Sequence, residues 1–192
     1  MNFLAHLHVA KATNTSAVGN LLGDFVKGEV DGLHFNDEIK KGIRLHRAID
    51  SFTDEHELTK SLKSELGEYR RYGGIVLDVF YDHQLASQFE LFNPSPLSQF
   101  SNEVYKELVL TDEVYPQRFV KVVNSMTEMD WLTGYGDIAN IHRALLGISS
   151  RLSRPVELGK TVDWYLKNIK CITKEFPTFY EELLEFARSH SK

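Results

Sequence analysis

The sequence has a single cysteine among its 192 residues, Cys171, so no disulfide can form within the chain. No run of apolar residues is long enough to cross a membrane. The first eight residues lack the basic start and unbroken apolar core of a signal peptide, because His6 and His8 interrupt them. These absences predict a cytoplasmic protein in a reducing compartment, with no membrane partner.

Positive charge is also scarce. The 22 Lys and Arg residues are outnumbered by 27 Asp and Glu residues, which gives a formal net charge of −5. Proteins that bind nucleic acid without further selectivity carry an excess of positive charge. We therefore expect no nucleic-acid partner, although a local basic patch is compatible with this total.

Strand-like alternation, internal repeats and low-complexity segments are absent as well. Apolar residues recur instead with the three-to-four-residue spacing of amphipathic helices. A chain of this length forms one domain by default. We predict an all-α, compact single domain over residues 1–192, built from eight to ten helices.

Local signals predict several helix boundaries. Ser16 is expected to be the N-cap of a second helix that runs to about Lys27. Asp54 is expected to cap the helix that carries the next group of leucines. Pro177 is expected to divide the last helical stretch into two helices.

Motifs for several reaction classes are missing. The sequence has no glycine-rich phosphate loop of the P-loop or dinucleotide type. It has no nucleophile elbow around a serine. Cys171 has no catalytic pattern near it and is interpreted as a small core residue. P-loop, dinucleotide-dependent and serine-hydrolase mechanisms therefore find no support.

An apolar segment, residues 74–83, carries three ionisable side chains. Asp78 and Asp82 are four residues apart and share one face of a helix, and His83 follows at once. Carboxylates on an apolar helix need a cation, a proton or hydrogen-bond donors to offset the cost of burial. Two explanations remain open: a divalent metal site, or ion pairs with Arg70 or Arg71 and a structural His83.

Other helical segments add residues of the same chemical types. His46 and Asp50 are four apart beside an apolar face, and Asp24 lies among apolar neighbours. Helices that pack around one core can bring such residues into a shared site. Carboxylate-rich ligation without cysteine suits Mn²⁺, and also Mg²⁺ or Fe²⁺, better than structural zinc. The candidate metal ligands are Asp24, His46, Asp50, Asp78, Asp82 and His83, with His6 and His8 as secondary candidates.

Four blocks of the sequence resemble those of acyl carrier protein phosphodiesterases, the holo-acyl-carrier-protein hydrolases. The blocks are residues 1–8 (MNFLAHLH), 19–28 (GNLLGDFVKG), 42–50 (GIRLHRAID) and 77–83 (LDVFYDH), with weaker anchors at 131–132 and 147–151. The resemblance implies an enzyme of lipid metabolism, in fatty acid biosynthesis, that removes 4′-phosphopantetheine from the serine of the carrier protein. It also implies a fold related to the HD-type metal phosphohydrolases, of which this family is described as a divergent relative.

One departure limits what this resemblance implies. The sequence has no His-Asp dipeptide, the signature of ordinary HD enzymes, and carries Asp82 and His83 in the reverse order. Ligand roles therefore cannot be copied from the wider superfamily by motif. Catalytic roles are predicted for Asp24, His46, Asp82 and His83.

Five arginines are candidates for contacts with the phosphate or with the holo-acyl carrier protein: Arg47, Arg70, Arg71, Arg151 and Arg154. The alternative for each is a surface ion pair. Two other functions remain open. One is an HD-type hydrolase of nucleotides or other small phosphoesters, and the other is a non-catalytic helical binding protein whose His and Asp pairs are structural.

Overall fold

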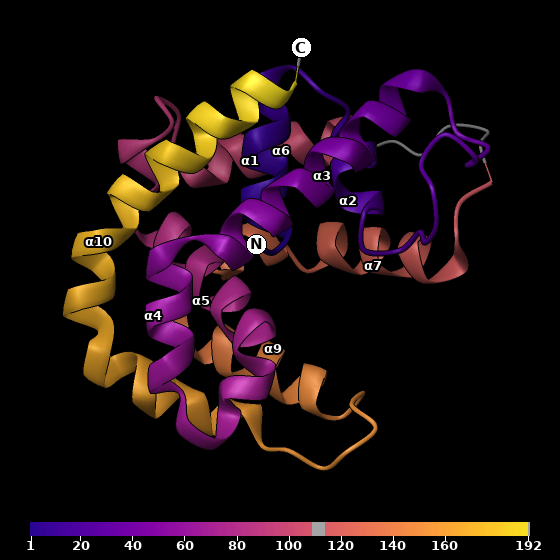
Figure 1. Ribbon diagram of the computed structural model, residues 1–192. Helices are drawn as coiled ribbons and strands as arrows, with labels where there is room; N and C mark the ends of the chain where they lie inside the picture. Colours follow the sequence, from indigo (N-terminus) through magenta and orange to yellow (C-terminus); the bar gives the residue numbers. More distant parts are fainter. Residues whose placement is uncertain (109–113, 192) are drawn as a thin grey trace.

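The computed structural model describes residues 1–108 and 114–191, and all regular elements within them are helical (Figure 1). This confirms the predicted all-α class. The α-helices are α1 (Phe3–Thr13), α2 (Ala17–Leu22), α3 (Asp37–Glu55), α4 (Glu57–Glu65), α5 (Gly73–Ser87), α6 (Leu97–Glu107), α7 (Gln117–Glu128), α8 (Trp131–Gly134), α9 (Ile138–Ser149) and α10 (Thr161–His190). Short 3₁₀ helices are η1 (Gly67–Tyr72), η2 (Phe89–Leu91) and η3 (Leu158–Lys160).

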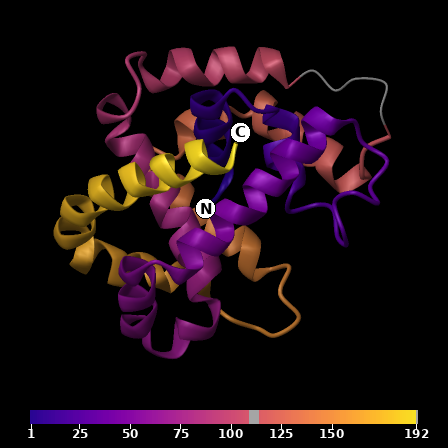
Figure 2. The same ribbon diagram turned by 45° about the horizontal axis from the view of Figure 1, so that its top comes forward.

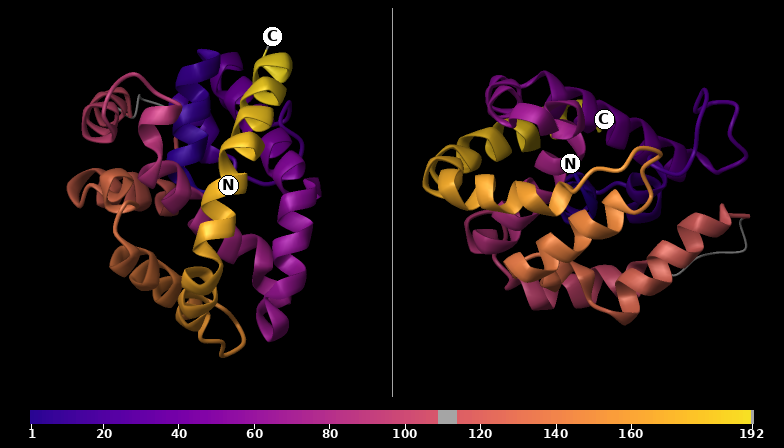
Figure 3. Two further views of the ribbon diagram at one scale, coloured as in Figure 1. Left: turned by 90° about the vertical axis from the view of Figure 1, so that its left-hand side faces the viewer. Right: turned by 90° about the horizontal axis from the view of Figure 1, so that it is seen from below.

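The helix α1 lies inside the molecule, and its indigo ribbon runs among the other helices in Figures 2 and 3. Its residues from Leu4 to Ala10 are all buried. It contacts α2, α5 and α10. A helix that is apolar on every side is a buried helix, so His6 and His8, which this helix carries, are buried with it.

The crossing of α2 and α3 depends on two glycines. A Cβ atom on Gly42 would lie 2.8 Å from the Cα of Gly19, and one on Gly19 would lie 2.4 Å from the carbonyl oxygen of Ile39. No side chain fits between the two backbones, so both positions require glycine. The close crossing brings the C-terminal end of α2 against the middle of α3.

The prediction that the second helix runs to Lys27 was wrong, because α2 ends at Leu22. The chain then turns and forms a loop up to Asn36, the N-cap of α3. The guanidinium of Arg47 donates to the carbonyl oxygens of Val26 and Gly28, at 3.1 and 2.7 Å, and holds this loop on α3. These tertiary contacts end α2 earlier than its apolar spacing suggests.

The expected cap at Asp54 was also wrong. Asp54 belongs to the last turn of α3 and accepts a hydrogen bond from Lys63 at 2.6 Å. His56 is the N-cap of α4, and its Nδ1 accepts from the backbone N–H of Leu58. A histidine nitrogen can satisfy a free N–H at a helix start as an Asp oxygen does.

The prediction that Pro177 divides the last stretch was wrong as well, because α10 continues through it. A proline inside a helix removes one hydrogen bond and bends the helix, and Figure 1 shows α10 curving along one side of the molecule. Phe176, Phe179 and Tyr180 on either side of the proline are buried in the core. Their burial offsets the lost hydrogen bond and keeps the helix continuous.

Among the described residues, no helix combines the length and the apolar composition that crossing a bilayer would require.

Candidate metal centre

Side chains from α1 and α3 meet in a cluster that could hold a metal ion. His6, His46 and Asp50 each offer a ligand atom, and these atoms lie within 4.8 Å of one another. The Nε2 of His46 is 3.0 Å from one oxygen of Asp50, and the Nε2 of His6 is 3.2 Å from the other. The two imidazole rings stack with centroids 3.9 Å apart. Asp50 therefore bridges two histidines that come from different helices.

The orientation of His46 is fixed by the end of α2. Its Nδ1 donates to the carbonyl oxygen of Asn20 at 2.7 Å. That bond leaves Nε2 directed at Asp50 and sets the tautomer of the neutral ring. Gly23 lies against the other side of the ring, because a Cβ atom there would come within 2.0 Å of the Cδ2 of His46. The early end of α2 therefore forms one wall of the site.

Asp24 follows this wall and joins the cluster from the solvent side. Its carboxylate oxygen lies 3.4 Å from the Nε2 of His46, and its side chain is 51% exposed. Burial raises the pKa of Asp24, but hydrogen bonding to His46 outweighs it and lowers the pKa overall. Asp24 is therefore ionised at neutral pH and faces both His46 and water.

The two stacked histidines differ in protonation. Burial lowers the pKa of His46, but the carboxylates of Asp24 and Asp50 outweigh it and raise the pKa to about 9. Burial and the nearby charge of His46 lower the pKa of His6 to about 4. The Nδ1 of His6 is buried without a partner, and its Nε2 meets only the carboxylate of Asp50, at 3.2 Å and without good hydrogen-bond geometry. A buried imidazole with so few partners is costly, and a metal ion at Nε2 would reduce that cost.

The donor set fits a divalent metal. Two imidazole nitrogens with the carboxylates of Asp50 and Asp24 are ligands that Mn²⁺ and Fe²⁺ accept, and no thiolate is near. The hydrogen bond from His46 to Asn20 is the kind of outer contact that orients a ligating histidine. A metal bound here would displace the proton from His46, since a ligating imidazole is neutral.

Asp78 has a different partner from the one that the sequence suggested. The α-ammonium group of Met1 lies 2.8 Å from Asp78 and 3.3 Å from Asp50. Burial alone would lower the pKa of this ammonium group, but the two carboxylates raise it to about 11. The alternative that Asp78 pairs with Arg70 or Arg71 was wrong, because the α-ammonium group of Met1 supplies the positive charge.

Asp82 is fully buried and binds the start of α1. Its two oxygens accept from the backbone N–H groups of Leu4 and Ala5, at 2.8 and 3.2 Å. Burial raises the pKa of Asp82 to about 7, in opposition to these two donors. Asp82 thus satisfies the free N–H groups at the start of α1, and this contact fixes the first turn of the helix, which carries His6.

His83 lies away from the cluster. Its Nδ1 donates to the carbonyl oxygen of Tyr135 at 2.7 Å, and its ring meets that of Tyr165 edge-on. This is the surrounding of a satisfied structural histidine, the second of the two explanations given above. The described residues that group as a metal site do not include Asp24, Asp78, Asp82 or His83. Of these four, Asp24 contacts His46 directly.

The candidate arginines fall into two groups. Arg47 binds loop carbonyls, as described above. Arg70, Arg71, Arg151 and Arg154 are exposed and make no ion pair within the described residues. The second group is therefore free to meet a charged partner.

Comparison with known proteins identifies the family of this chain. The profile of the family described as "Acyl carrier protein phosphodiesterase" matches residues 1–183. The chain belongs to this family. A protein named acyl carrier protein phosphodiesterase from Serratia proteamaculans is 31% identical to it over 98% of each chain. Proteins of the same name from Pectobacterium atrosepticum and Escherichia coli are 32% and 34% identical, over 98% and 97% of each chain. No solved structure matches the chain.

Family membership confirms the resemblance carried by the four sequence blocks. The first three blocks of this acyl carrier protein phosphodiesterase relative supply the whole cluster: His6, Asp24, His46 and Asp50. The fourth block supplies Asp78 and Asp82, which hold the start of the chain and of α1 against α5.

His6 was predicted only as a secondary ligand candidate, although it lies at the centre of the cluster. Its signal was present, because it lies in a segment that is apolar on every side and must therefore be buried. A histidine in such a helix needs a partner, which makes it a stronger ligand candidate than an exposed one.

Proposed function

We propose that this protein hydrolyses the phosphodiester of holo-acyl carrier protein, releasing 4′-phosphopantetheine and leaving the apo-protein. Water adds to phosphorus, the bond from phosphorus to the seryl oxygen breaks, and the serine hydroxyl recovers a proton. The observation that carries this proposal is the cluster of His6, His46, Asp50 and Asp24, whose residues lie in three of the four sequence blocks that resemble the family. The names of the relatives specify the carrier-protein substrate.

The cluster is proposed to hold a divalent metal, Mn²⁺ first and Mg²⁺ or Fe²⁺ as alternatives, through His6, His46 and Asp50. Such an ion lowers the pKa of a bound water and offsets negative charge on a phosphoryl oxygen. The poorly hydrogen-bonded, buried ring of His6 supports this assignment. Asn20 and Gly23 keep the ring of His46 in one orientation.

Asp24 is proposed to hold a proton during the reaction. It is the member of the cluster most exposed to water, and it is ionised at neutral pH. A carboxylate there can accept a proton from the attacking water at its Oδ1 and return it toward the leaving seryl oxygen. Asp82 and His83 are proposed to act on this site only through the placement of α1 and α5.

The carrier protein is proposed to meet the exposed arginines Arg70, Arg71, Arg151 and Arg154 in the cytoplasm. Acyl carrier proteins are acidic, and this chain carries a net charge of −5, so productive contact needs a local basic surface. The single cysteine fits a reducing compartment.

The decisive experiment incubates holo-acyl carrier protein with the purified protein and Mn²⁺ and measures the mass of the carrier protein. Conversion to the apo-protein mass is expected, together with its loss in excess chelator and in His46→Ala. A panel of nucleotides and small phosphodiesters run in parallel tests the alternative substrates. Cleavage of the panel with an unchanged carrier protein would overturn the proposal, as would full activity in His46→Ala.

A further inference from the structure

A groove runs along one face of α9, with a volume of about 610 Å³. One wall is aromatic, formed by Phe3 and Trp131, whose rings stack with centroids 6.1 Å apart. The opposite wall is the face of α9 that carries Asn140, Arg143 and Gly147, and Arg151 lies just past the helix end. These α9 positions recur at three- and four-residue intervals, so they form one continuous face.

Gly147 is the least expected residue in this wall. A glycine inside a helix costs about 1 kcal/mol relative to alanine. Close packing does not require it, because a Cβ atom at Gly147 would meet nothing within 4 Å. Its backbone conformation does not require it either, since positive φ among the described glycines occurs at Gly28 and Gly67. What its missing side chain provides is open space in the groove.

The groove begins beside the candidate metal centre. Asn2 and Phe3 line it, and the residue before them, Met1, contacts Asp50 and Asp78. Asn2 also donates to the hydroxyl of Tyr135, at the end of the groove where His83 holds the Tyr135 carbonyl. The first residues of the chain therefore join the groove to the centre, and a molecule with its phosphate at the centre would extend toward the groove.

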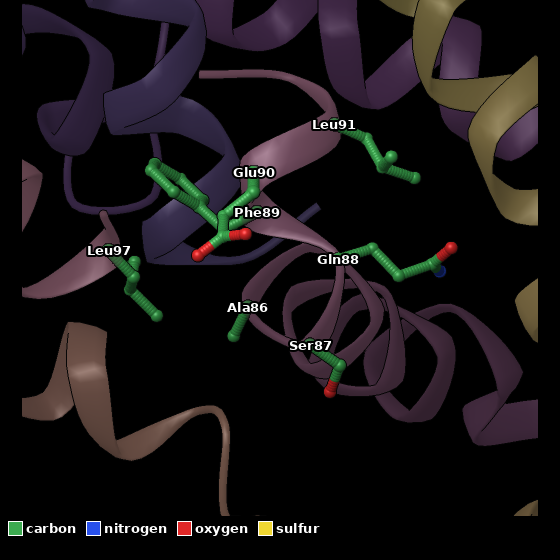
Figure 4. A pocket seen from close by; sticks show the side chains of 7 residues that line it. All are labelled: Ala86, Ser87, Gln88, Phe89, Glu90, Leu91 and Leu97. Carbon is green, nitrogen blue, oxygen red and sulfur yellow. The ribbon is translucent and has the colours of Figure 1, made fainter. Parts of the chain in front are cut away.

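A second hollow, at the end of α5, lacks these features (Figure 4). It has a volume of about 380 Å³, and its one charged side chain is that of Glu90. An anionic ligand would be repelled there. The groove along α9 instead carries two arginines and one aspartate, Asp130, whose carboxylate is engaged by Tyr105 and Thr133.

We propose that the groove along α9 binds the pantetheine arm of the substrate. This inference rests on the proposed function. The arm is a flexible chain of methyl, methylene and amide groups that ends in a thiol, with a phosphate at the other end. Its apolar parts suit Phe3 and Trp131 and its amides suit Asn140, while its phosphate stays at the candidate metal centre.

The test fills the groove at Gly147. Binding of free 4′-phosphopantetheine is measured by calorimetry in the full chain for the wild type and for Gly147→Phe. The matched control is Ala139→Phe, which adds the same side chain at an exposed position of α9 outside the groove. We expect Gly147→Phe to weaken binding at least about tenfold, or about 1.4 kcal/mol, and Ala139→Phe to bind as the wild type does. Equal binding by all three proteins would overturn the proposal.

A second variant keeps the test decisive if Gly147→Phe fails to fold by circular dichroism. Trp131→Ala is expected to weaken 4′-phosphopantetheine and pantetheine alike, because it removes a contact with the arm and none with the phosphate. Unchanged binding of both ligands, or an effect on 4′-phosphopantetheine alone, would overturn the groove.

The same proteins separate this inference from the proposed function. The calorimetry needs no turnover, and with pantetheine it needs no metal. If the wild type converts holo-carrier protein to the apo-protein and Gly147→Phe does so at an unchanged kcat/KM, the groove is wrong and the function stands. If the wild type leaves the carrier protein intact but binds 4′-phosphopantetheine in the groove, the hydrolase function is wrong and the groove stands.

Discussion

The stacked rings of His6 and His46 are in opposite protonation states. His46 holds a proton because Asp24 and Asp50 face it, whereas burial and the charge of His46 keep His6 neutral. A metal ligand must be a neutral imidazole, so a divalent cation and this proton compete for the Nε2 of His46. Cation binding is therefore expected to release protons and to strengthen as the pH rises.

The first prediction concerns these two ligands. His6→Ala and His46→Ala should each weaken Mn²⁺ binding by roughly ten- to a hundredfold or more, by analogy with losses around other metal sites. Calorimetry with Mn²⁺ alone measures this without a substrate. His190→Ala is the matched control, because His190 is exposed near the C-terminal end and bonds only locally. Unchanged Mn²⁺ affinity in both variants would show that the cluster is structural.

A second prediction concerns His8 and pH. His8 is buried, and its Nδ1 lies 2.8 Å from the hydroxyl of Tyr180. Burial lowers its pKa to about 4, whereas an unfolded histidine titrates near about 6.5. The unfolded chain therefore takes up a proton first as the pH falls. The stability that neutral His8 contributes is complete above about pH 6.5 and declines by up to about 3 kcal/mol as the pH drops toward 4.

Urea unfolding of the wild type and His8→Gln at several pH values measures this effect. Glutamine can keep a hydrogen bond to Tyr180 but does not titrate in this range. The variant should be less stable at pH 7.5, and it should lose less stability than the wild type between pH 7 and 4.5. If the free energy of unfolding falls equally in the two proteins between pH 7 and 4.5, protonation of His8 does not cause the loss of stability in acid.

At the scale of elements, the close packing of α2 on α3 shapes the candidate metal centre. Gly19 and Gly42 let the two backbones touch, and Gly23 at the end of α2 lies against the ring of His46. The short helix α2 therefore acts on the chemistry mainly through its backbone: the carbonyl of Asn20 holds one ring nitrogen of His46, and the turn after the helix places Asp24 beside the other.

The third prediction tests this wall. In Gly23→Ala the new methyl group would meet the ring of His46, so the ring must move away from Asp50. We expect a loss of stability of about 1–3 kcal/mol and Mn²⁺ affinity reduced by at least about tenfold, which is about 1.4 kcal/mol. Gly32→Ala is the control, because a Cβ atom there makes only an ordinary contact, 3.6 Å from the carbonyl of Glu29. Equal Mn²⁺ affinity in Gly23→Ala and Gly32→Ala would contradict the role of Gly23.

Helical periodicity predicted the class and most of the elements, because amphipathic spacing is a local property. It failed where contacts between elements decide the outcome. Arg47 and the ring of His46 shape the chain after Leu22, and buried aromatic residues carry α10 through Pro177. Neither effect is visible in the spacing of apolar residues.

The same distinction between local spacing and contacts between helices applies to the site. The pairing of His46 with Asp50 could be predicted, since residues four apart on a helix are neighbours. Whether His6 or His83 is the second histidine of the site could not be predicted from the sequence. It depends on which helix brings its histidine next to His46 on α3. The carboxylate of Asp82 is a suitable metal-ligand group, but both of its oxygens accept hydrogen bonds from the start of α1.

At the scale of the whole molecule, charge is unevenly distributed. The chain is acidic overall, with a net charge of −5. Yet four exposed arginines without ion pairs among the described residues lie on η1 and just after α9: Arg70, Arg71, Arg151 and Arg154. The segments around η1 and η3 are neighbours, since Lys160 lies within range of the charge on Glu68. Arg70 and Arg71 therefore lie near the segment that follows α9, and Arg151 lines the groove itself.

The fourth prediction follows from this distribution. An acidic carrier protein is repelled by the net charge and attracted by the basic segments, and both effects are screened over about 10 Å at 0.1 M salt. Because the attraction acts at the point of contact, kcat/KM for holo-carrier protein should fall as salt rises, while hydrolysis of a small phosphodiester should change little. Charge reversal of Arg70 and Arg71 to Glu should raise KM for the carrier protein and flatten its salt dependence. Reversal of Lys170 and Lys174 on α10 makes the same change in net charge outside the basic segments, so it separates local from total charge. If both double variants raise KM equally, the total charge governs the encounter and the arginines do not form a docking surface.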